Sequence, residues 1–189
     1  MALIYWNKNT LQDQAILCLK ESNENIKIEK KDTYTLIKSK NEIIGINIKN
    51  ASNFLKLNEG ANTITEEIKN LIQKNLGVDL SNYDLENKLY IGKIIKRIKH
   101  PKSDKLFILN VEADEKLQIV TNTTNSLEGK FIVVAKIGAL LPSGIRIKPT
   151  KIMGIESQGM ICGEETLGIG KKDGAYLPIG VKEGQKFTL

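Results

Sequence analysis

Residues 89–113 read LYIGKIIKRIKHPKSDKLFILNVEA and contain two apolar runs that are joined by a basic turn. Pro101 fixes its own φ and keeps His100 extended, and Asp104 can accept backbone N–H bonds that close the turn. Two strand-forming runs around such a turn are typical of a β-hairpin. The sequence therefore predicts a hairpin whose stiff turn carries cations.

The rest of this half has the same character. Short apolar segments separated by Gly and Pro fill residues 114–189, and no long helical pattern interrupts them. About seven strand candidates in roughly a hundred residues favour a sandwich or a small Greek-key barrel. Residues 86–189 are therefore predicted to form an all-β domain, either a sandwich or a small Greek-key barrel such as the OB-fold, whose closed sheet has no exposed edges.

Residues 1–85 have a different pattern. Apolar residues alternate at period two over residues 26–48, which indicates a meander of strands. Apolar residues over 64–76 fall on one helical stripe, with Thr65 as the N-cap and Gly77 as the terminator. The polar, turn-rich stretch that follows marks a domain boundary. We therefore predict a small α+β domain of unknown role ahead of the β domain.

The 189-residue chain has a formal net charge of +6, and the whole excess lies in its second half. Residues 86–189 contain 15 Lys, 2 Arg and 11 acidic residues, whereas residues 1–85 contain 11 Lys and 11 acidic residues. A positive field confined to one domain is typical of a module that binds a polyanion.

Several classes of protein are disfavoured by composition. Two distant cysteines, Cys18 and Cys162, and a single histidine, His100, do not form a disulfide framework or a zinc site. We predict no metal and no cofactor. No stretch approaches the roughly 18 apolar residues of a membrane helix, and the first residues lack a secretory signal pattern. The sequence thus predicts a cytoplasmic protein without a membrane partner.

Cations gather in two places of the second half, on the predicted hairpin and after the turn at Pro142. We predict that they contact phosphates. These candidates are Lys93, Arg97, Lys99, Lys102, Lys105, Arg146, Lys148 and Lys151. If the fold brings both sets together, they could follow a phosphate backbone and release its counterions. The alternative is a solvated edge strand that is protected by lysines.

Aromatic residues help to decide which kind of nucleic acid fits. Proteins that hold single strands stack the bases on exposed rings. In the second half, Phe107 and Phe131 lie within apolar strands, where the core should claim them. A folded RNA, recognised by its shape, phosphates and 2′-hydroxyls, therefore fits better than a single strand.

Residues 154–165, GIESQGMICGEE, raise the question of a reactive thiol, a metal site or a loop that turns beside a partner. A single cysteine in such a segment is typical of a small buried side chain. As a general base, His100 has no acid or nucleophile at a recognisable spacing. We predict no catalytic residue and interpret the segment as scaffold, in which glycines permit close backbone approach.

Three blocks, in this order, carry a family resemblance: HPKSDKL at 100–106, VVAKIGALLPSG at 133–144 and IKPTKIMGIESQGMICGEETLGI at 147–169. They resemble the tRNA-binding OB-fold domain, and this resemblance implies that residues 86–189 form an OB-fold barrel. That domain is appended to bacterial methionyl-tRNA synthetase and lies near the start of the bacterial phenylalanyl-tRNA synthetase beta subunit. The whole chain is similar to stand-alone bacterial members of the family.

The resemblance implies a non-catalytic protein that binds folded tRNA through phosphate and shape contacts. The family signature S-x-G-M-x-C corresponds to residues 157–162, and it implies a loop that packs on the barrel at its tRNA-facing side. On that ground Ser157, Gln158 and Met160 join the predicted RNA contacts. The implied partners are tRNA and an aminoacyl-tRNA synthetase or another translation protein. Relatives of the barrel also form homodimers.

Two departures from the family pattern concern the RNA face. Residues 119–125, IVTNTTN, lack a frequent Gly-Ala, and Gly163 replaces a frequent Ser. Two other functions stay open. The chain could be a tRNA-dependent deacylase that edits mischarged tRNA. It could also be an OB-fold chaperone or assembly module, in which residues 1–85 recruit a protein.

Overall fold

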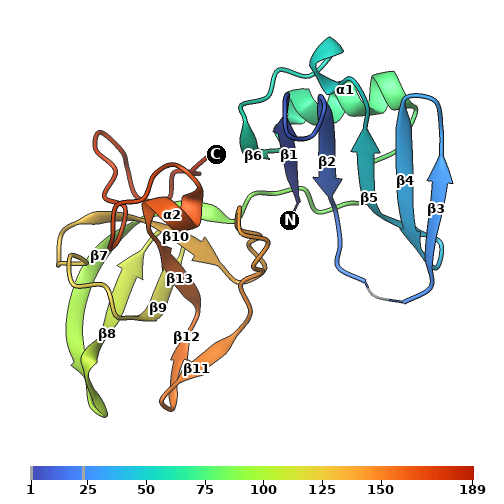
Figure 1. Cartoon of the computed structure of the whole chain (residues 1–189). Coiled ribbons are helices and arrows are strands. Elements are labelled where there is room, and N and C mark those ends of the chain that lie inside the picture. The colour runs from blue at the N-terminus through green and yellow to red at the C-terminus, as the bar shows by residue number, and fades with distance from the viewer. Residues whose placement is uncertain (1, 23) are drawn as a thin grey trace. The chain divides into compact units, whose positions relative to one another are not determined.

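The structure is a computed structural model that describes residues 2–22 and 24–189. The chain divides into two compact units, one that extends to Asn87 and includes Leu189, and one that comprises Lys88–Thr188. Both units are built mainly from antiparallel strands (Figure 1). None of the helices among the described residues is both long and apolar enough to cross a membrane.

The first unit is a six-stranded antiparallel sheet with the order β3-β4-β5-β2-β1-β6. Its strands are β1 (Leu3–Asn7), β2 (Gln14–Cys18), β3 (Ile26–Lys30), β4 (Tyr34–Ser39), β5 (Glu42–Ile48) and β6 (Gly60–Thr63). A short 3₁₀ helix, η1 (Ala51–Asn53), precedes β6, and the helix α1 (Glu66–Leu76) follows it. The sheet and the helix confirm the predicted combination of strands and one helix.

Local signals set the ends of α1. Thr65 Oγ1 accepts a hydrogen bond from the backbone N of Ile68 at 3.2 Å, as an N-cap does. Gly77 ends the helix in the left-handed conformation at φ 65°, which costs glycine little. The apolar stripe of α1, with Ile72 and Leu76, packs against one face of the sheet. Both predicted caps are confirmed.

The second unit is a five-stranded antiparallel sheet with the order β13-β10-β7-β8-β9. Its strands are β7 (Leu89–His100), β8 (Ser103–Glu112), β9 (Lys116–Thr121), β10 (Phe131–Lys136) and β13 (Gly159–Cys162). A separate hairpin pairs β11 (Thr150–Ile152) with β12 (Ile155–Ser157), and the short helix α2 (Glu164–Leu167) follows β13. The predicted hairpin around Pro101 is confirmed as β7–β8.

The five-stranded sheet curls around an apolar core (Figure 1). Gly92 permits this curvature in β7, because a Cβ there would lie only 2.4 Å from Val111 Cγ1. A β-bulge between Ile94 and Lys96 adds a local bend. The core consists of Ile94, Leu109, Val111, Leu117, Ile119, Ile132, Val134, Ile161 and Ala175.

Hydrogen bonds connect the two opposite edges of the curled sheet. Gln158, directly before β13, donates its backbone N–H to the Gln118 carbonyl of β9 at 2.8 Å. The Gln118 backbone N–H donates in turn to Gln158 Oε1 at 2.7 Å, and Val120 N donates to Ser157 Oγ at 3.1 Å. Backbone groups at the β9 edge are thereby satisfied, which protects that edge from pairing with other chains.

Candidate nucleic-acid interface

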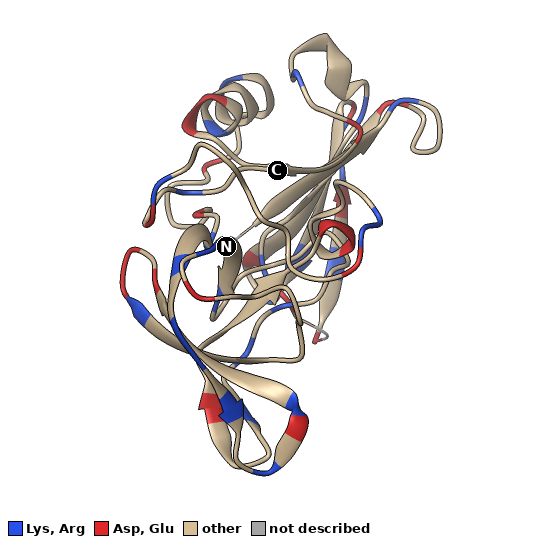
Figure 2. Ribbon diagram, turned by 90° about the vertical axis from the view of Figure 1, so that its left-hand side faces the viewer, with Lys and Arg blue, Asp and Glu red and all other residues tan. Residues whose placement is uncertain are grey.

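The β7–β8 hairpin holds the first set of predicted cations. Lys99, Lys102 and Lys105 lie at or near its tip, and their side chains are exposed. Pro101 and Lys102 form the turn between the strands, as the sequence predicts. Figure 2 shows that basic residues are distributed along several loops and hairpins and alternate with acidic ones. Local geometry must therefore decide which cations act together.

His100 fastens the hairpin tip to the β11–β12 hairpin. Its Nδ1 accepts a hydrogen bond from the Lys102 backbone N at 3.1 Å, so the ring proton is on Nε2. Nε2 then donates to the Ile152 carbonyl oxygen at 3.2 Å. His100 as a whole is only 4% exposed. Both ring nitrogens have structural partners, which leaves His100 a positioning role between two hairpins.

The hydrogen bonds of His100 bring members of both predicted cation sets together. Lys102 Nζ lies 3.8 Å from the position that a Cβ on Gly154 would occupy, at the turn of the second hairpin. Lys151 is exposed on β11 of that hairpin. We name the resulting group the hairpin cluster, which consists of Lys99, Lys102, Lys105 and Lys151.

Two other predicted cations are partly engaged by aromatic rings. The Arg97 guanidinium carbon lies 3.4 Å from the Phe107 ring centroid, and Lys93 Nζ lies 5.9 Å from that of Phe131. Arg97 Nη2 also donates to the Thr124 carbonyl oxygen at 3.5 Å. Both rings are half-buried beneath these cations. Each ring is therefore only partly buried in the core, and the cation covers part of its remaining surface.

The second predicted set is divided. Arg146 Nη1 donates to the Gly138 carbonyl oxygen at 3.2 Å, and Gly138 adjoins Lys88, at the start of β7. The hairpin tip is at the other end of this 12-residue strand, which is about 36 Å long when measured along the chain. Arg146 is thus remote from the hairpin cluster, whereas Lys151 belongs to it. Lys148 is exposed and lies between Arg146 and Lys151 in the sequence.

The loop residues predicted to touch RNA lie next to the closure of the sheet. Ser157 is 4% exposed, and besides accepting from Val120 its hydroxyl donates to the Gly159 carbonyl oxygen at 2.9 Å. Gln158 uses its side-chain oxygen to bind β9, and Met160 is half-buried. The polar side-chain groups of Ser157 and Gln158 thus hold sheet edges together, and a contact of any of the three with RNA stays a prediction.

Cys162 is completely buried in β13, opposite Val133 of β10. Burial disfavours the thiolate and raises the pKa of Cys162 from 9.0 to about 12. A nucleophilic thiol needs a lowered pKa and access to solvent, and Cys162 has neither. Its position supports the interpretation of residues 154–165 as scaffold. Among residues 2–22 and 24–189, no three His, Cys, Asp or Glu side chains are grouped to hold a metal ion.

Alkaline pH provides a test of the Cys162 burial. Because its pKa is raised in the folded state, its contribution to stability is intact below pH 9 and is lost progressively as the pH rises toward 12. We expect the free energy of unfolding to fall more steeply with pH in the wild type than in Cys162→Ala. The difference between the two slopes should reach up to about 1.4 kcal/mol per pH unit. Urea unfolding of both proteins at several pH values between 8 and 11 measures the difference. Equal slopes would contradict the buried neutral thiol.

Sequence reasoning did not single out Lys96. It is exposed and pairs with Asn110 across the β7–β8 ladder, on the outer face of the sheet. Strict alternation along β7 would put residues 94 and 96 on the same face. The bulge places Ile94 in the core and Lys96 outside. Only an observed bulge could reveal this, since the sequence of β7 carries no mark of its position.

Comparisons with known proteins agree with the motifs. The family described as "Putative tRNA binding domain" matches residues 89–186. A Bacillus subtilis (strain 168) protein named "Putative tRNA-binding protein YtpR" is 32% identical over 172 residues, 86% of this chain and 86% of that protein. The phenylalanine-tRNA ligase beta subunit of Fusobacterium nucleatum is 36% identical over 144 residues, which are 72% of this chain but 18% of that subunit.

A solved structure, "Crystal structure of MetRS related protein from Pyrococcus horikoshii", aligns with 26% identity and a TM-score of 0.37. The alignment covers 52% of this chain and 87% of that one. The resemblance read from the three sequence blocks is confirmed by the family match and by the two relatives above.

Proposed function

This chain belongs to the tRNA-binding domain family, and from that premise we propose that it is a non-catalytic protein that binds folded tRNA. In this proposal the second unit is an OB-fold barrel and carries the binding surface, whereas residues 1–85 have a separate role. Contacts are made to phosphates and to the shape of the RNA, with little sequence preference. The protein acts in the cytoplasm, where tRNA, synthetases and other translation proteins are its partners.

The hairpin cluster is the observation that supports this proposal most directly. Four exposed ammonium groups come from two hairpins that His100 holds together. Because the two hairpins are already held together, only the lysine side chains lose conformational freedom when they bind phosphates. Each neutralised phosphate releases condensed counterions and so adds affinity. Lys148, Arg146, Lys93 and Arg97 extend the surface in this proposal, the last two with part of their charge directed to aromatic rings.

A deacylase function receives no support from the groups that the sequence offers for it. The Cys162 thiol is buried with a raised pKa, and both nitrogens of His100 are engaged by backbone groups. Neither side chain is available to attack or activate an acyl bond. We therefore propose binding and no hydrolysis.

Titration with tRNA across a salt series tests the proposal. We expect the full chain to bind unfractionated tRNA, with an affinity that falls steeply between about 50 and 200 mM salt because phosphate contacts dominate. Fluorescence anisotropy with labelled tRNA measures the affinity at each salt concentration. A plot of log affinity against log salt concentration then gives the salt slope. Single-stranded oligonucleotides of the same length serve as controls and should bind more weakly. An absence of tRNA binding at 50 mM salt would refute the proposed function.

A further inference from the structure

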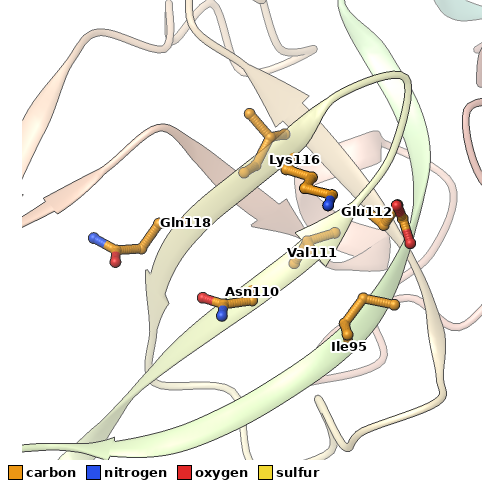
Figure 3. Close-up of a pocket in the computed structure, with 7 residues that line it drawn as sticks. Ile95, Asn110, Val111, Glu112, Lys116 and Gln118 are labelled. Atoms are coloured by element: carbon orange, nitrogen blue, oxygen red, sulfur yellow. The ribbon is translucent and has the colours of Figure 1, made fainter.

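A pocket of about 360 Å³ lies on β7, β8 and β9, away from the tip of the hairpin. It is lined by Ile95, Asn110, Val111, Glu112, Lys116, Leu117 and Gln118. Val111 and Leu117 belong to the core, so their neighbours Asn110, Glu112, Lys116 and Gln118 project from the opposite, outer face. The pocket is thus on the outer surface of the curled sheet (Figure 3).

The β-bulge of β7 forms one wall of the pocket. Ile94 is in the core, and Arg97 pairs with the core residue Leu109, so the two residues between them both face outward. One is Ile95, whose side chain is 50% exposed, and the other is Lys96. An apolar wall with a cation beside it results. A straight strand would present only one outward residue here.

The polar lining is available for a ligand. Asn110, Glu112 and Lys116 have no side-chain hydrogen bond or ion pair with any residue that the structure describes. Gln118 uses its Nε2 to donate to the Glu156 carbonyl oxygen at 2.8 Å, which fixes the orientation of its amide. Figure 3 shows the two amides toward one end of the pocket and the charged ends of Glu112 and Lys116 toward the other.

We propose that this pocket binds one unpaired base of the bound RNA, with guanine as the preferred base. The proposal rests on the proposed tRNA binding and adds a site at which a base is recognised. Ile95 contacts the face of the base, and the amides of Asn110 and Gln118 bond to its edge. The Glu112 carboxylate has two acceptor oxygens, and guanine offers two adjacent donors, N1–H and N2–H₂.

The surroundings favour a nucleotide over an uncharged ligand. Lys96 and Lys116 are exposed beside the pocket, and both can reach the phosphates that flank a bound base. Five residues of β7, about 17 Å, separate Ile95 from His100 at the hairpin tip. Lys99 pairs with Phe107 on the core-facing side of the hairpin, so an RNA strand in the pocket reaches the hairpin cluster by passing around the hairpin tip.

Replacement of Glu112 by glutamine separates this proposal from simple electrostatics. If Glu112 is only a surface acid, Glu112→Gln makes the surface more positive and tRNA binds more tightly. If Glu112 accepts bonds from a base, the same variant should weaken tRNA binding about tenfold and leave the salt slope unchanged. Glu156→Gln is the matched control, since Glu156 is also exposed in the second unit, and it should bind equally or more tightly.

A titration of the ¹⁵N-labelled full chain with the four nucleoside 5′-monophosphates tests the pocket without tRNA. We expect GMP to shift the amide signals of residues 95, 110–112 and 116–118 more than the other nucleotides do, and Glu112→Gln to remove this preference. Unchanged signals in these segments would overturn the proposal. GMP binding with unaltered tRNA affinity in Glu112→Gln would also overturn it, because the pocket would then serve a free nucleotide. Failure of tRNA binding alone refutes the proposed function, which the salt series detects separately.

Discussion

Simultaneous replacement of Lys99, Lys102 and Lys151 by glutamate is expected to lower tRNA affinity at least about 100-fold at low salt. Three ammonium groups on adjoining hairpins are lost, and three negative charges then repel the phosphates. The slope of log affinity against log salt concentration should fall by about three, one for each phosphate contact. Anisotropy titrations of the full chain between about 50 and 200 mM salt measure both quantities.

The matched control makes the same change of charge in the other unit. Lys27, Lys30 and Lys31 are exposed at and beside the edge strand β3, and their replacement by glutamate also alters the net charge by six. We expect this variant to bind tRNA within a few-fold of the wild type. If both variants lose affinity equally, net charge governs binding and the hairpin cluster is not the interface. Thermal unfolding should show that both variants remain folded, since all six side chains are exposed.

Gly159→Val is expected to destabilise the second unit by about 2 to 3 kcal/mol, which corresponds to a decrease in melting temperature of roughly 10 to 20 °C. Gly159 is not among the residues with positive φ, so the strain is one of space and not of backbone conformation. A Cβ at this position would lie 2.8 Å from the Ala135 carbonyl oxygen of β10. To relieve that overlap, β13 must move away from β10, and the adjoining bonds between Gln158 and Gln118 would be strained as well.

Thermal unfolding followed by circular dichroism measures the loss, and amide hydrogen exchange at Gln118 and Gln158 locates it. Thr150→Val is the matched control, because residue 150 is an exposed strand position where a β-branched side chain fits, and the change removes only an exposed hydrogen bond from the Thr150 hydroxyl to the Lys148 carbonyl oxygen. Gly159→Ala should lie between the wild type and Gly159→Val. A melting temperature for Gly159→Val within about 2 °C of the wild type would mean that β13 and β10 do not approach so closely.

The elements that depend on neighbouring residues were predictable from the sequence. Thr65, the apolar stripe of α1 and Gly77 act within a few residues of one another, so the helix and both its ends follow from local rules. The turn at Pro101 and the short apolar runs likewise predicted the β7–β8 hairpin. The three sequence blocks identified the family, because each reflects a local loop or strand.

The arrangement of the candidate interface was not predictable in this way. His100 meets Ile152 across 52 positions, and Gln118 meets Gln158 across 40. Such contacts depend on how the whole sheet curls, and a short segment of sequence does not encode that curvature. The length of β7 separates Arg146 from the hairpin tip, although the sequence groups it with Lys151.

The sequence by itself determined the family, the helix of the first unit, the β-rich character of the second and the excess of cations there. Only the tertiary structure decided which cations adjoin, why Gly159 must be glycine and where the pocket beside Ile95 lies. The physical reason is that hydrogen bonds and sterics between distant strands fix these positions. A bulge of one residue in β7 is enough to turn both Ile95 and Lys96 outward.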